Sequence, residues 1–221
     1  MKLSEKTLSF LKNFSTINQS INFKQGSTLR TISVMKNILA EVTIDEELPK
    51  DFGIYDLGQF LNGLSLHNNP ELDFENDGHV VIKEGRSRSK YFFADPSVIV
   101  TPPEKDITLP SEDVSFDLST EQLDKLLKAA AIYQLPDLAV VGKDGVVKVV
   151  VRDKKNDTSN DFAITVGETD ATFSFNFKVE NIKILPGTYT VVVSQKLLSR
   201  FTNKNQDLVY FIALEPDSTF G

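Results

Sequence analysis

The sequence predicts an α+β protein made of two similar domains, each built from two β-α-β-β-β units. Three observations predict this fold class. Apolar residues recur with helical spacing in only a few stretches, strand-like runs fill most of the remainder, and a proline-rich segment at 101–110 divides the chain near its middle. At 221 residues and 40% hydrophobic, the chain can bury a sizeable core. We expect helices on one surface and antiparallel sheets on the other.

The first half begins with a predicted amphipathic helix over residues 3–17. Its apolar stripe consists of Leu3, Phe10, Leu11, Phe14 and Ile17, and its opposite side carries Lys2, Lys6 and Lys12. A second helix is predicted over 57–66, because Asp56 is a good N-cap and Gln59 follows at the capping-box position. Strands are predicted at 21–23, 28–34, 39–44, 52–55, 71–74, 79–83 and 87–93.

The second half repeats this order after the proline-rich linker, so we predict domains at 1–100 and 111–221. Ser119 and Gln122 start a helix over 120–133 that buries Leu123, Leu126, Leu127 and Ala130 and exposes Lys125 and Lys128. A short fourth helix is predicted around 179–185, ending at Pro186-Gly187 and carrying Lys183. Strands are predicted at 114–118, 138–141, 146–152, 162–166 and 172–177, with three more before Leu214.

The overall charge differs from the charge on the helices. The chain has 31 Asp and Glu against 24 Lys and Arg, yet lysines lie on the solvent side of its two clearest helices. Such a distribution suits a protein that contacts a polyanion at one surface. The same lysines also form i,i+4 pairs, Glu121 with Lys125 and Asp124 with Lys128, which ordinary solvated helices use. On charge alone, the second interpretation is favoured.

Composition excludes several classes of protein. The absence of cysteine excludes a disulfide scaffold, thiolate zinc sites and a cysteine nucleophile. Glu5, Lys6 and Lys12 interrupt the N-terminal stretch, which is unlike a signal peptide, and no apolar run approaches the ~20 residues of a membrane span. We therefore expect a soluble intracellular protein.

No catalytic constellation or cofactor motif is apparent. The two histidines, His67 and His79, lie at element edges without ligand or triad spacing. The nearest approach to a metal site is a calcium-loop pattern formed by Asp73, Asp77 and Glu84. Strands flank this pattern where helices are required, so a hairpin turn at 76–78 is favoured. We predict no enzyme activity, no cofactor and no metal, with a calcium-binding module as a weak alternative.

Four stretches resemble the sliding clamp of T-even-type bacteriophages, the processivity factor of the phage DNA polymerase. They are MKLSEKTLSFLKNFSTIN at the start, IYDLGQFLNGLSL at 54–66, ADPSVIVTPPEKDI at 94–107 and ALEPDSTFG at the end. The resemblance implies the DNA-clamp fold and a homotrimeric ring that encircles duplex DNA without sequence preference, with helices lining the inner face. The residues that would then face the DNA are Lys2, Lys6, Lys12, Lys125, Lys128 and Lys183.

The resemblance also implies partners and contact surfaces. The partners are the DNA polymerase, a clamp-loader ATPase complex and phage late-transcription factors, in the cytoplasm of the infected bacterial host. The strand at 87–93 would pair with the strand at 162–166 of the next subunit, although charges on an edge strand also guard against unwanted pairing. The runner-up function is a β-rich phage structural or adaptor protein. The predicted subunit interface contains Arg86, Arg88, Lys90, Tyr91, Asp161, Phe162 and Ile164, and the predicted partner-peptide pocket contains Val98, Val100, Ile107, Leu109, Phe211 and Leu214.

Overall fold

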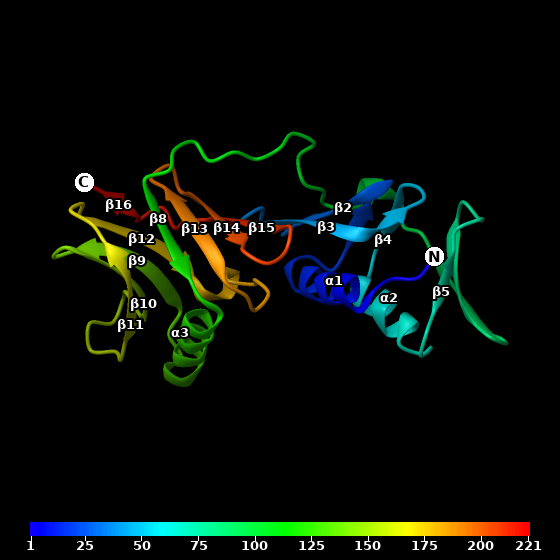
Figure 1. Ribbon diagram of the computed structural model, residues 1–221, viewed down its shortest axis with the longest axis horizontal. Helices are drawn as coiled ribbons and strands as arrows, with labels where there is room; N and C mark the ends of the chain where they lie inside the picture. The colour runs from blue at the N-terminus through cyan, green and yellow to red at the C-terminus, as the bar shows by residue number, and fades with distance from the viewer. The chain divides into compact units, whose positions relative to one another are not determined.

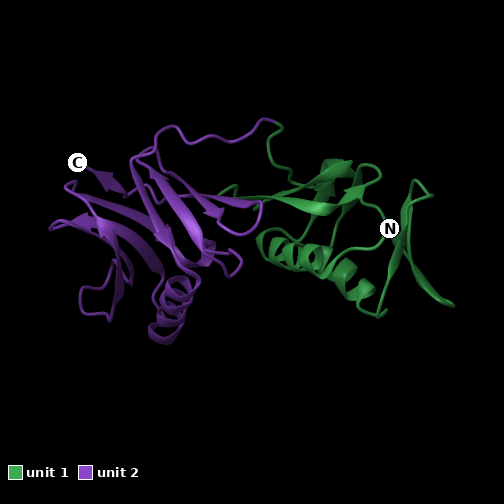
Figure 2. Ribbon diagram, in the orientation of Figure 1, with its two compact units in different colours: residues 1–104 green, residues 105–221 purple.

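The computed structural model describes residues 1–221, which divide into two compact units, 1–104 and 105–221 (Figure 2). The division falls inside the proline-rich segment. Between the 3-10 turn η1 (Pro96–Val98) and strand β8 (Val114–Leu118) the chain forms no helix or strand. Proline lacks the backbone N–H that a ladder needs, which explains why this segment stays irregular.

Unit 1 contains two helices and three groups of antiparallel strands (Figure 1). β1 pairs with β4, β2 pairs with β3, and β5, β6 and β7 form a three-stranded sheet. Helix α1 packs against β2, β3 and α2. The elements are α1 (Glu5–Ile17), β1 (Ile21–Phe23), β2 (Gly26–Ile32), β3 (Ile38–Leu48), β4 (Phe52–Ile54), α2 (Leu57–Leu64), β5 (Glu71–Asp73), β6 (His79–Glu84) and β7 (Ser87–Phe92).

Phe10, Leu11, Phe14 and Ile17 of the predicted apolar stripe are buried on α1, but the helix begins later than its periodicity indicated and leaves Leu3 outside it. Ser4 is the N-cap, and its hydroxyl accepts a hydrogen bond from the backbone N–H of Thr7 at 3.2 Å. A capped N-terminus of this kind fixes the first helical residue. Lys2 and Leu3 consequently precede the helix.

Helix α2 begins as predicted and ends two residues early. Asp56 caps it by accepting from the N–H of Gln59 at 2.8 Å. Beyond the helix, the backbone hydrogen bonds span three residues instead of four: the N–H of Leu66 donates to the carbonyl of Gly63, and that of His67 to the carbonyl of Leu64. These tighter bonds end the α-helix, and Leu66 is left 78% exposed.

Unit 2 contains one α-helix and two groups of antiparallel strands. β11, β10, β9, β12 and β16 form one sheet in that order, while β15, β14, β13 and β8 lie consecutively in another. Helix α3 packs against β10 and β11 (Figure 1). The elements after β8 are α3 (Thr120–Tyr133), β9 (Asp137–Lys143), β10 (Val146–Arg152), β11 (Phe162–Glu168), β12 (Phe173–Lys178), β13 (Tyr189–Ser194), β14 (Leu198–Asn203), β15 (Leu208–Ala213) and β16 (Thr219–Phe220).

Local signals placed several of these elements correctly. Ser119 and Gln122 form both hydrogen bonds of the predicted capping box at α3. The β9–β10 turn has Asp144 and Gly145 at φ values of 54° and 83°, with Lys143 paired to Val146. Such a turn needs positive φ at both central residues, which an Asp-Gly pair tolerates well.

The fourth predicted helix is wrong. Only a single 3-10 turn, η2 (Val179–Asn181), forms there, and no helix or strand follows until β13. No side chain caps η2, and Pro186 stops any continuation within a few residues. Unit 2 therefore has one β-α-β-β-β unit with a true helix, and Lys183 is not on a helix.

No helix in either unit is both long enough and apolar enough to cross a membrane.

Candidate nucleic-acid and subunit-contact surfaces

The solvent side of α1 carries a small excess of positive charge, because Lys6 and Lys12 outnumber the single acidic residue of the helix, Glu5. Lys12 is exposed and makes no ion pair, and Lys2 is exposed just before the helix. Lys6 Nζ lies 3.8 Å from Asp45 Oδ1, a long and exposed ion pair, and 6.0 Å from the ring centroid of Phe10. A weak pair of this kind is easily exchanged for another anion.

The solvent side of α3 is arranged differently, because each of its lysines is paired one turn back. Lys125 Nζ lies 2.7 Å from Glu121 Oε1, and Lys128 Nζ lies 2.7 Å from Asp124 Oδ2. The hydrogen bond from Lys125, with its positive charge, lowers the pKa of Glu121. The face therefore carries matched charges of both signs.

The remaining predicted DNA-facing residue, Lys183, lies apart from the helix surfaces. It follows η2, is half-buried and stands between the buried residues Ile182 and Ile184. The structure thus places Lys6 and Lys12 on α1, with Lys2 beside it, and Lys125 and Lys128 on α3.

Strand β7 is an edge strand with two unlike faces. Tyr91 pairs with the buried Val80 of β6, and its hydroxyl donates to the carbonyl of Asp56 at 2.9 Å. Burial raises the pKa of this phenol. Arg88 and Lys90 are exposed on the opposite face, and Arg86 lies in the turn before the strand. Tyr91 thus packs into unit 1, while the basic residues remain in solvent.

Strand β11 is the corresponding edge of unit 2. Phe162 and Ile164 pair with the buried Val151 and Val149 of β10, yet they stay half-exposed because nothing continues the sheet beyond them. Asp161 is exposed just before the strand begins, and Glu168 is exposed at its last position. Both strands predicted to meet across subunits therefore have unpaired backbone groups on one side.

The predicted peptide-pocket residues differ in exposure. Val98 is 59% exposed, whereas Phe211 and Leu214 are only 8% and 6% exposed. Val100, Ile107 and Leu109 are half-buried.

Arg30 is a residue of this region that the sequence did not reveal. Its Nη1 donates to the carbonyl of Pro103 at 3.0 Å, and its Nε lies 2.8 Å from Glu41 Oε2. It thereby holds the start of the proline-rich segment against β2. No local pattern marks such a residue, because a charged side chain in a strand usually faces solvent.

The calcium-loop pattern does not assemble. Asp73 accepts from Lys83 Nζ at 3.1 Å, Asp77 pairs with Lys50 at 3.1 Å, and Glu84 accepts from the backbone of the loop after α2. The three carboxylates are thus held by separate donors, and no group of three or more metal-ligating side chains converges anywhere in the chain.

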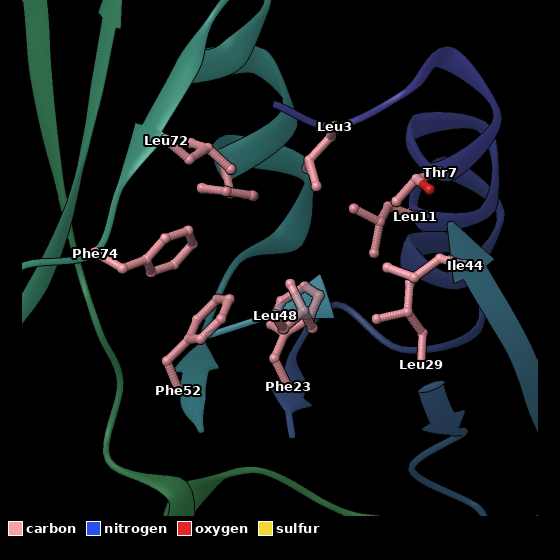
Figure 3. A pocket seen from close by; sticks show the side chains of 11 residues that line it. Leu3, Thr7, Leu11, Phe23, Leu29, Ile44, Leu48, Phe52, Leu72 and Phe74 are labelled. Carbon is pink, nitrogen blue, oxygen red and sulfur yellow. The ribbon is translucent and has the colours of Figure 1, made fainter. Parts of the chain in front are cut away.

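An apolar space inside unit 1 belongs to its core. In Figure 3, the side chains of Phe23, Leu48 and Phe52 lie close together. Leu72, on β5, and Phe74, just after it, line the side of the space opposite α1. The one polar lining residue, Thr7, donates its hydroxyl to Glu46 at 2.6 Å. No free polar group points into this space to orient a substrate.

Comparisons with known proteins match both halves of the chain. The family model "DNA polymerase processivity factor" matches residues 2–101, and "gp45 sliding clamp, C terminal" matches residues 115–216. The chain belongs to the sliding-clamp family. A sliding clamp of Vibrio phage KVP40 is 34% identical over 97% of this chain and 99% of the relative. Those of Escherichia phage RB69 and Enterobacteria phage T4 are 34% and 33% identical, each over 99% of both chains.

Solved structures show that the clamp fold extends over nearly the whole chain. PCNA from A. fulgidus, solved with the C-terminal region of FEN-1, matches with a TM-score of 0.69 at 16% identity, covering 99% of this chain and 98% of that one. PCNA from Thermococcus kodakaraensis matches with a TM-score of 0.69 at 14% identity, over 95% and 96%. The predicted fold class is confirmed, and the function is that of a phage DNA polymerase processivity factor. A structural or adaptor role is not favoured.

Proposed function

We propose that this clamp acts as a homotrimeric ring that encircles duplex DNA and tethers the replicative polymerase of its phage. The observation that carries the proposal is the match of the chain, over nearly its full length, to phage sliding clamps. A closed ring stays on DNA by topology, so its contacts with DNA can remain weak enough for sliding. Such a protein acts without a catalytic step or a cofactor.

The surfaces that meet DNA are those of α1 and α3. Lysines on a helix face attract phosphates through water without reading sequence. The exposed side of α2 carries only Gln59 and Asn62, so it adds no charge. The proposed DNA-facing set is Lys2, Lys6, Lys12, Lys125 and Lys128.

Ring closure uses the two free edges. β7 of one subunit pairs with β11 of the next, which is a heterologous contact that closes when the rotation between subunits closes. Arg88 and Lys90 then approach Asp161 and Glu168, so charge favours this pairing over pairing between like edges.

Partners dock through short apolar peptides at the proline-rich segment. Val98 and Ile107 offer accessible apolar surface there, and the prolines reduce the entropy lost on binding. The polymerase, the clamp-loader ATPase and late-transcription factors would share this region, in the cytoplasm of the infected host. Ile107→Glu should keep rings intact and abolish polymerase stimulation in primer-extension assays. Full stimulation would place docking elsewhere.

Native mass spectrometry tests the ring directly. We expect a species at three times the 24.7 kDa chain mass, with a central hole visible in small-angle scattering. Replacing Lys6, Lys12 and Lys125 by Glu should preserve that species and reduce processivity, because exposed lysines contribute little to folding. A monomer at all accessible concentrations, both with and without DNA, would overturn the proposal.

A further inference from the structure

The two proposed DNA-facing helices differ in a way that their lysine counts hide. On α3, both exposed lysines are bonded to carboxylates of the preceding turn at 2.7 Å. On α1, Lys12 has no such partner, and Lys6 is held only at 3.8 Å. With Glu5 counted, α1 keeps a net charge of +1 from Lys6 and Lys12, whereas Glu121, Asp124, Lys125 and Lys128 cancel on α3.

We propose that Glu121 and Asp124 act as internal counter-ions that limit how strongly α3 grips DNA. A phosphate that approaches Lys125 or Lys128 competes with the carboxylate already bonded there, and the negative charge of that carboxylate also repels it. Each lysine then exchanges between its own carboxylate and a DNA phosphate, so neither contact is held long. This inference rests on the proposed function, since it requires α3 to face the DNA.

Stability alone does not account for these pairs. All four side chains are more than half exposed, and pairs of this kind contribute little to folding in water. Their effect on DNA is larger, because each lysine freed to neutralise a phosphate releases a counterion and steepens the salt dependence of binding by about 0.9 in log–log slope. The carboxylates of Glu121 and Asp124 thus lower the affinity of the clamp for DNA and let it diffuse faster along the duplex.

The test is the double variant Glu121→Gln with Asp124→Asn in the full chain. These changes keep side-chain size and leave the Ser119–Gln122 capping box in place. We expect tighter binding to a linear duplex at low salt, a salt slope steeper by up to about 2 per subunit, and slower diffusion of loaded rings along DNA in single-molecule tracking.

Two controls separate the possible failures. Asp117 lies on β8, and its carboxylate pairs with Lys204 at 2.5 Å. The variant Asp117→Asn removes this carboxylate and should leave DNA binding unchanged. Lys125→Gln with Lys128→Gln should weaken DNA binding. If this lysine variant weakens binding while the carboxylate variant matches the original protein, the counter-ion role is wrong and the proposed function stands. If neither variant changes binding or diffusion, α3 does not face the DNA, and both assignments fall.

Discussion

Glu46 shows how one side chain can connect a strand to the start of a helix. It lies on β3, where its Oε1 accepts from the backbone N–H of Ser4 and its Oε2 accepts from Thr7 Oγ1 at 2.6 Å. Burial by itself would raise the pKa of Glu46, but the hydrogen bonds from Thr7 and Ser4 outweigh it, and the pKa lies below its usual value. The carboxylate also lies close to the positive end of the α1 dipole.

Replacing Glu46 should destabilise unit 1 in a pH-dependent way. We expect Glu46→Ala to lower the free energy of unfolding by about 1–2 kcal/mol at neutral pH, as measured by urea denaturation. Because the folded pKa is depressed, this contribution is present above the unfolded value of about 4.3 and is lost as the pH falls through the folded pKa. Glu47→Ala, at an exposed neighbouring position, should have little effect. A deficit that persists unchanged at pH 3 would contradict this assignment.

Gly142 is required by an aromatic ring that covers it. A Cβ at this position would lie 2.3 Å from Phe173 Cε1, and Phe173 is only 2% exposed. Gly142→Ala should therefore destabilise unit 2 by about 1–3 kcal/mol through overpacking. In Gly167→Ala the new Cβ would meet nothing within 4 Å, so thermal melting of that variant should be nearly unchanged. Equal melting temperatures for the two variants would exclude this explanation.

At the scale of elements, β16 is the strand that no pattern predicted. It has two residues, and it completes the five-stranded sheet by pairing Phe220 with Phe173 and Thr219 with Ser174. The ring of Phe220 stacks over those of Phe173 and Phe175 at centroid distances of 6.0 and 5.9 Å. Asp217 Oδ2 pairs with Lys154 Nζ at 2.7 Å and anchors the segment before the strand.

The aromatic stack predicts which residue of β16 matters. Phe220→Ala should uncover Phe173 and Phe175 and reduce unit 2 stability by about 1 kcal/mol in chemical denaturation, since part of an aromatic side chain leaves its packing partners. Thr219→Ala, on the exposed neighbour, should be near neutral. If Thr219→Ala cost more stability than Phe220→Ala, the stacking of the Phe220 ring would not be what holds this edge.

At the scale of the whole molecule, the two edge strands carry unlike charge. Arg88 and Lys90 lie on β7. Asp161 lies just before β11, and Glu168 is its last residue. A head-to-tail ring places unlike edges together at every contact, so the same charges stabilise each of its interfaces.

Reversing the charge of Arg88 and Lys90 should open the ring. We expect Arg88→Glu with Lys90→Glu to shift the protein toward smaller species in analytical ultracentrifugation, most strongly at low salt, where repulsion from Asp161 and Glu168 is least screened. Adding Asp161→Lys and Glu168→Lys should restore assembly. If the double variant were as stable as the original ring at every salt concentration, β7 and β11 would not meet in this way.

The amino-acid sequence by itself determined the features that depend on near neighbours. The stripe of α1, the caps at Asp56 and Ser119, and the Asp144-Gly145 turn each rest on interactions within a few residues, so they can be predicted without the fold. The predicted helix at 179–185 does not form, because no side chain caps its N-terminus.

Only the tertiary structure decided which strand edges stay open, which side of β7 Tyr91 faces, and that Arg30 holds Pro103. The tertiary structure also brought β16 to β12, across more than forty residues of chain. These features depend on contacts between residues far apart in the chain, and hydrophobic periodicity carries no information about which distant partners will meet.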